Sequence, residues 1–136
     1  MFSVYILPAA LLAAAFSLGI NLLIRWAGHA GIVYWGPIFE ELLKTGFALF
    51  FNTSVPGTHI LFGVLEAAGE CLWGKNMRVP ALLSGIAAHS VFGLITFYII
   101  KSGYNVIVAV TIAAAVHILW NGAVLKISGA KTSGKV

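Results

Sequence analysis

Residues 79–100 read VPALLSGIAAHSVFGLITFYII, an apolar run without any Asp, Glu, Lys or Arg. A transmembrane helix needs about 20 consecutive, mostly apolar residues, and this run reaches that length with only His89 as an ionisable residue near its middle. Four similar runs cover residues 3–27, 32–51, 57–74 and 104–127. The sequence therefore predicts an all-α fold, a polytopic membrane helix bundle of about five transmembrane helices that occupies residues 1–127.

The composition supports lipid as the solvent of this chain. Of its 136 residues, 60% are hydrophobic and only 9% are charged, and a soluble domain of this size needs far more charge to cover its surface. The net charge of +4 comes from scattered basic residues that lie mostly between the apolar runs. Such residues are typical of membrane topology signals, and we expect no nucleic-acid partner.

The positions of the basic residues predict the orientation of the bundle. Lys101 alone falls on one side, and six basic residues fall on the other: Arg25, Lys75, Arg78, Lys126, Lys131 and Lys135. Because the side richer in Lys and Arg faces the cytoplasm, we expect a multi-pass protein of the cell membrane with its N-terminus outside. Residues 128–136 are then a basic cytoplasmic tail, predicted to lack regular structure.

Several polar residues fall inside the apolar runs, where a centrally placed charge costs at least about 2.5–3.5 kcal/mol. They lie near the same depth in antiparallel helices, so we expect them to satisfy one another in one cluster. They are Glu40, Glu41, Lys44, Glu66, Glu70, His89, His117 and Asn121.

The spacing of these residues predicts some of their contacts. Glu40 and Lys44 are four residues apart and can pair on one helix face. Gly85 and Gly93 stand one turn either side of His89, and small residues let membrane helices approach closely. Three residues are predicted to lie outside the cluster: Asn21 in a helix–helix hydrogen bond, and His29 and His59 as solvated interface residues.

Glutamates and histidines gathered at one level permit hydrolytic chemistry. Two histidines and one carboxylate can hold a zinc ion and leave one coordination position for water. Bound water loses a proton more readily, and a neighbouring glutamate can act as the general base. A carboxylate can also activate water without a metal, and the residues leave both mechanisms open.

Four short motifs follow one another on successive apolar runs: EELLK (40–44) resembles EExxK, FGVLE (62–66) resembles FxxxE, AHSVFG (88–93) holds the next histidine, and HILWN (117–121) resembles HxxxN. In this order they resemble the PrsW-type intramembrane proteases, which are related to the CAAX prenyl protease and bacteriocin-processing (CPBP, or Abi) families. The CAAX branch usually has EExxxR and FxxxH instead, so the PrsW branch is the more similar one. The chain is short for this family and lacks further helices.

The resemblance implies cleavage of membrane-embedded or membrane-proximal peptides. It assigns water activation to Glu40 and Glu41, and a ligand or oxyanion role to Asn121. The candidate metal ligands or acid–base groups are Glu66, His89 and His117, and the resemblance leaves open whether zinc is required.

Two other functions fit the same polar residues. The glutamates and histidines could form a relay that conducts protons or ions, or the chain could be a non-catalytic subunit of another membrane protein. A purely structural network of hydrogen bonds between helices is the simplest alternative. Because five helices are few for enclosing a dry site, we expect a homo-oligomer or a partner subunit.

Overall fold

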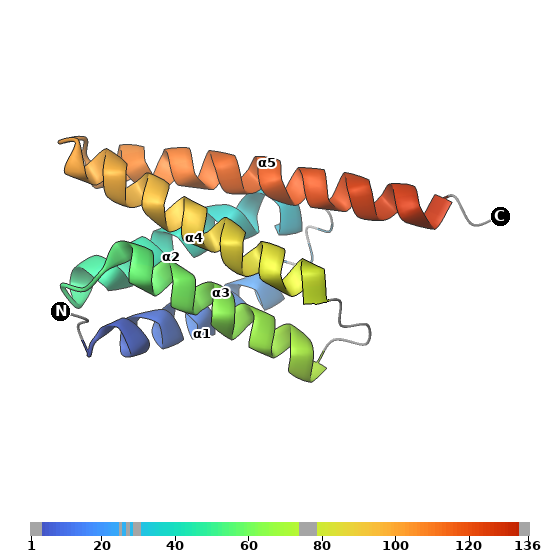
Figure 1. Cartoon of the computed structure of the whole chain (residues 1–136), viewed down its shortest axis with the longest axis horizontal. Helices are drawn as coiled ribbons and strands as arrows, with labels where there is room; N and C mark the ends of the chain where they lie inside the picture. The colour runs from blue at the N-terminus through green and yellow to red at the C-terminus, as the bar shows by residue number, and fades with distance from the viewer. Residues whose placement is uncertain (1–3, 25, 27, 29–30, 74–78, 134–136) are drawn as a thin grey trace.

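A computed structural model describes residues 4–24, 26, 28, 31–73 and 79–133. Within these residues the chain forms five α-helices and no strand, which confirms the predicted all-α bundle (Figure 1). The elements are α1 (Ile6–Ile24), the π-helical turn η2 (Gly31–Trp35), α2 (Gly36–Phe50), α3 (Val55–Trp73), α4 (Val79–Lys101) and α5 (Val106–Ser133). The prediction for His29 lies outside the described residues.

Several helix boundaries differ from the predicted ones by a few residues, and two of the differences affect the arguments below. Helix α3 begins at Val55 rather than near residue 57, because Pro56 is tolerated in the first turn of a helix. Helix α5 continues to Ser133, so the prediction that residues from 128 onward lack regular structure is wrong for 128–133. No proline stands between residues 106 and 133 to end the helix.

Successive helices run antiparallel, and α3 packs most extensively against α4 (Figure 1). Tight turns make this possible. In the α2–α3 turn Asn52 has a φ of 47°, a left-handed conformation that asparagine tolerates better than most residues. Gly103, with a φ of 90°, does the same between α4 and α5. As a result, the end of α3, the start of α4 and the end of α5 lie at one end of the bundle.

The bundle exposes many large apolar side chains, and its interior holds charged side chains among small apolar ones, which is unusual for a soluble protein. Leu23, Ile107 and Leu119 are each more than 70% exposed, whereas the charged Glu41 and Lys44 are completely buried. Among the described residues, three helical segments are long and apolar enough to cross a membrane: Ile6–Ile24, Val79–Lys101 and Val106–Ile127. These features are those of a membrane protein.

Helices α2 and α3 are not among these three segments, although both were predicted to span. Helix α2 has only 15 residues, and η2 extends it by one further turn at its start. Helix α3 has 19 residues, but Glu66 and Glu70 lower its mean hydropathy. The two helices that carry all four glutamates are therefore the less apolar ones, and the three apolar helices pack around them.

Small residues allow α3 and α4 to approach closely. A Cβ atom on Gly93 would lie 2.6 Å from Cβ of His59, and one on Gly63 would lie 3.2 Å from Cβ of His89. The predicted role of Gly93 is thus confirmed. The same prediction for Gly85 is wrong, because a Cβ there would meet no atom within 4 Å.

We expect Gly93→Ala to lower the free energy of unfolding by about 1–3 kcal/mol, since the added methyl group overpacks the α3–α4 contact. Gly85→Ala is the matched control on the same helix, and we expect it to be neutral or slightly stabilising. Thermal unfolding in detergent, followed by circular dichroism, measures both. Equal midpoints for the two variants would show that the contact tolerates the methyl group.

Candidate functional site

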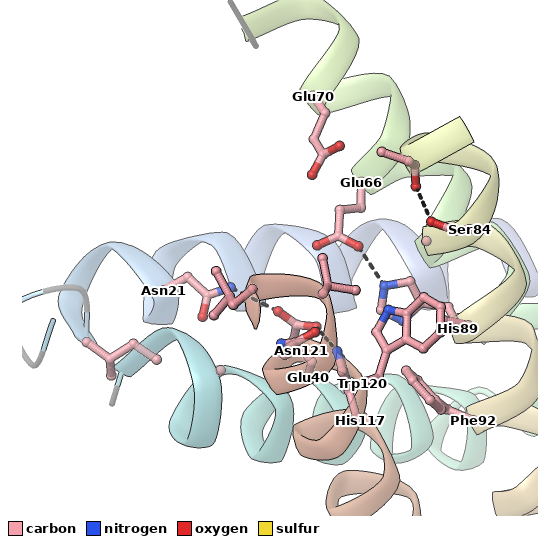
Figure 2. Close-up of a pocket in the computed structure, with 17 residues that line it drawn as sticks. Asn21, Glu40, Glu66, Glu70, Ser84, His89, Phe92, His117, Trp120 and Asn121 are labelled. Carbon is pink, nitrogen blue, oxygen red and sulfur yellow. Dashed lines mark hydrogen bonds and ion pairs between the residues drawn. The ribbon is translucent and has the colours of Figure 1, made fainter. Parts of the chain in front are cut away.

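A pocket of about 420 Å³ opens at the end of the bundle where α3 ends and α4 begins (Figure 2). Its polar lining includes Glu40 from α2, Glu66 from α3, His89 from α4 and His117 and Asn121 from α5. Its apolar lining includes Ile24, Ala88, Phe92, Trp120, Val124 and Leu125. All five helices contribute to the pocket, and its polar residues come from helices far apart in the sequence.

Glu41 holds His117 in place from behind the pocket. Its Oε1 atom lies 3.0 Å from Nδ1 of His117, and a carboxylate can only accept in such a contact. Nδ1 of His117 therefore carries the proton and donates it, which leaves the lone pair of Nε2 free. This Nε2 atom lies 3.9 Å from Oε2 of Glu40.

Lys44 connects Glu41 to His89. Its Nζ atom lies 2.5 Å from Oε1 of Glu41 and 3.1 Å from Nδ1 of His89, and it stands 4.7 Å from the centre of the Phe62 ring. On the other side of His89, Nε2 lies 2.6 Å from Oε2 of Glu66. The side chain of Glu66 is 44% exposed, so this last contact is at the open side of the cluster.

Asn21 holds Glu40 from α1. Its Nδ2 atom donates to Oε1 of Glu40 over 3.0 Å. This confirms the predicted helix–helix hydrogen bond of Asn21 and identifies α2 as the partner helix. Nδ2 also lies 3.4 Å from the hydroxyl of Ser17 one turn earlier. With Oε1 engaged in this way, Glu40 turns its Oε2 atom toward His117.

Aromatic rings fix the planes of the two imidazoles. Phe92 stacks on His117 at 4.6 Å between ring centres, with an angle of 25° between the planes. Phe62 meets His89 edge to face at 5.3 Å. The two imidazoles are 5.2 Å apart and nearly perpendicular. Packing thus limits the rotation of both rings.

The structure brings the six predicted site residues together, but in two layers. Five of them line the pocket, whereas Glu41 lies behind it and is fully buried. The possible pair between Glu40 and Lys44 is absent; Lys44 pairs instead with Glu41, three residues away. Adjacent residues on a helix point about 100° apart, so Glu40 faces α1 while Glu41 faces the core.

Two further ionisable residues, His59 and Glu70, lie near this cluster. His59 was predicted to be solvated, and this is wrong: it is fully buried, with Nδ1 3.5 Å from Oε2 of Glu41 and Nε2 3.4 Å from the hydroxyl of Thr45. Because α3 begins before residue 57 and Gly93 lets α4 close over it, His59 lies a full turn inside the bundle. Glu70 lies at the pocket rim and forms no ion pair with any described residue.

Three residues are close enough together to be considered as metal ligands. They are Glu40, His89 and His117, whose potential ligand atoms lie within 4.8 Å of one another. The set predicted from the sequence had Glu66 in place of Glu40. In this arrangement Glu40 and His117 have lone pairs free for a cation. His89 does not, because both of its ring nitrogens are engaged, one with Lys44 and one with Glu66.

Comparison with protein families, with characterised proteins and with solved structures finds no match to this chain.

Proposed function

We propose that this protein is an intramembrane peptidase that hydrolyses peptide bonds of membrane-embedded or membrane-proximal substrates, similar to the PrsW-type proteases. The observation that carries the proposal is the Glu41–His117 contact of 3.0 Å behind a pocket of about 420 Å³. A carboxylate that orients a histidine, whose other nitrogen faces a cavity, is the arrangement of a general base.

The geometry suggests how such a reaction would proceed. A water molecule between Oε2 of Glu40 and Nε2 of His117, which are 3.9 Å apart, would lose a proton to His117 as its oxygen attacks the substrate carbonyl. The carbon–nitrogen bond then breaks, and His117 returns the proton to the departing amine. The amide of Asn121, one turn further along α5 and also in the pocket lining, could donate to the carbonyl oxygen.

The location of the pocket fits a substrate from the membrane. The pocket lies at the end of the bundle where α3 ends, α4 begins and α5 ends. The excess of basic residues at this end predicts that it faces the cytoplasm. Its apolar lining suits an extended, apolar peptide segment near the cytoplasmic leaflet. We propose that a second copy or a partner subunit completes the enclosure of the site.

One observation favours a second candidate function, a proton relay. A chain of polar contacts starts in the pocket at Glu66 and His89 and continues behind it through Lys44 and Glu41 to His59. Each link measures 3.5 Å or less. His59 lies in the second turn of α3, at the opposite end of that helix from Glu70. Proton flux into proteoliposomes that is abolished by His59→Gln, without peptidase activity in the wild type, would favour the relay.

The test of the peptidase uses the purified chain in proteoliposomes with a library of membrane-spanning peptides in ¹⁸O water. We expect new peptide termini that carry one ¹⁸O atom. Glu40→Gln should lower the rate about a hundredfold, because the amide keeps the shape of the side chain but lacks the charge that orients the water.

Leu42→Ala is the matched control, since Leu42 lies on the outer face of the same helix and is 49% exposed. We expect it to cleave at the wild-type rate. Cleavage that is equally fast in wild type, Glu40→Gln and His117→Gln would mean that the pocket does not carry the activity.

A further inference from the structure

We propose that Lys44 is a positioning residue that holds His89 as a proton donor, so that the pocket presents one donor and one acceptor imidazole. This inference rests on the proposed peptidase for its chemical purpose. It concerns the hydrogen atoms of the two histidines, and these can be observed without any substrate.

The neighbours of His89 determine which of its nitrogens carries the proton. An ammonium group has three donors and no acceptor, so Nδ1, at 3.1 Å from Nζ of Lys44, must accept. A neutral imidazole has one proton, which is then on Nε2. Oε2 of Glu66, a carboxylate acceptor, lies 2.6 Å from that Nε2 atom and matches this assignment.

The neighbours of His117 place its proton on the other ring nitrogen, Nδ1. Its Nδ1 atom faces the carboxylate of Glu41 at 3.0 Å and therefore carries the proton. The same ion pair, between Glu41 and Lys44 at 2.5 Å, thus acts on both rings: its anion binds the N–H of His117, and its cation binds the lone pair of His89. All of these groups except Glu66 are buried, so water cannot easily replace either partner.

The opposite protonation of the two rings has a consequence for the substrate. Nε2–H of His89 is the donor available to the oxygen of a substrate carbonyl, and Nε2 of His117 is the acceptor for the proton of water. Glu66 occupies the position of that oxygen when no substrate is bound. Its side chain is 44% exposed and can move out of the pocket, so the substrate class is one with a strong hydrogen-bond acceptor at the scissile group.

A second consequence concerns metals. A histidine that binds a metal through one nitrogen normally donates the other N–H to a carboxylate or carbonyl. His89 has an ammonium where that acceptor would be, so zinc binding through Nε2 would require an imidazole without any proton. We therefore expect the Glu40, His89 and His117 set to leave zinc unbound in the wild type.

The experiment is ¹⁵N NMR of protein labelled in its histidine rings, with signals assigned from His89→Gln and His117→Gln. In the wild type we expect the proton of His89 on Nε2 and that of His117 on Nδ1. Lys44→Met should raise the ratio of Nδ1–H to Nε2–H forms of His89 about tenfold or more, because a hydrogen bond from a charged donor is lost. Lys44→Arg keeps a donor and should restore the wild-type spectrum.

Lys101→Met is the matched control, since Lys101 is exposed at the end of α4, and it should leave both rings unchanged. If Lys44→Met does not fold, the wild-type spectrum alone decides. A proton on Nδ1 of His89 in the wild type, or stoichiometric zinc binding that is lost in His89→Gln, would overturn the inference.

These readouts separate the inference from the proposed function. Opposite tautomers in a protein that cleaves no peptide would refute the peptidase and leave the role of Lys44 intact. Cleavage by a protein whose His89 carries its proton on Nδ1 would refute the role of Lys44 and leave the peptidase intact.

Discussion

Replacing His117 by glutamine is expected to lower kcat for peptide hydrolysis by about 10³–10⁴-fold, the upper range for loss of a positioned general base. Glutamine can still contact Glu41 through its amide, but it has no nitrogen that accepts a proton from water. Because His117 is 96% buried between Phe92 and Glu41, a side chain of similar length should keep the helices in place. The measurement is the initial rate of cleavage by wild type and variant at equal amounts of folded protein.

Leu119→Ala is the matched control for this prediction. Leu119 is on the same helix and is 73% exposed, so its truncation changes the outer surface and leaves the pocket as it is. We expect wild-type kcat for Leu119→Ala. A His117→Gln variant within tenfold of wild type would assign proton transfer to another group, and the proposed mechanism would be abandoned.

Replacing Lys44 by methionine is expected to lower the free energy of unfolding by about 3–5 kcal/mol, the cost of breaking a buried ion pair from one side. Glu41 and Lys44 are both fully buried, and their atoms lie 2.5 Å apart. Methionine fills much of the volume beside Phe62 but leaves the Glu41 carboxylate without its cation. Equilibrium unfolding in detergent measures the loss.

The double variant Lys44→Met/Glu41→Gln distinguishes charge from packing. With both charges removed, no isolated buried ion remains, and we expect most of the lost stability to return. If the double variant is as unstable as the sum of the two single variants, the aliphatic stem of Lys44, and not its charge, is what the core requires.

The helices and the polar cluster could be predicted from the sequence because both follow from the cost of placing charge in lipid. Runs such as 79–100 have the length and composition of a membrane helix, and glutamates inside such runs must find partners. That reasoning places Glu40, Glu41, His89 and His117 together, and the structure does so.

The pairing within the cluster could not be predicted, because it depends on the rotation and depth of each helix. The helical period alone could not show whether Lys44 would pair with Glu40 or with Glu41. Lys44 pairs with Glu41 because α2 is rotated so that Glu40 faces α1. His59 was missed for a related reason. Its burial depends on the start of α3 at Val55, two residues before the predicted start, and on Gly93 in another helix.

The polar interior of this bundle has a consequence for how the protein is made. Glu40 is bound by Asn21 of the earlier helix α1, but the Glu41–Lys44 pair also has partners in later helices, since Glu41 contacts His117 and Lys44 contacts His89. During synthesis α2 leaves the ribosome before α4 and α5, so the Glu41–Lys44 pair enters the lipid, or waits beside it, without His89 and His117. We therefore expect stable insertion of α2 to be delayed until α4 and α5 have been made. A nascent chain that stops before α5 should remain at the translocon and become a substrate of membrane quality control.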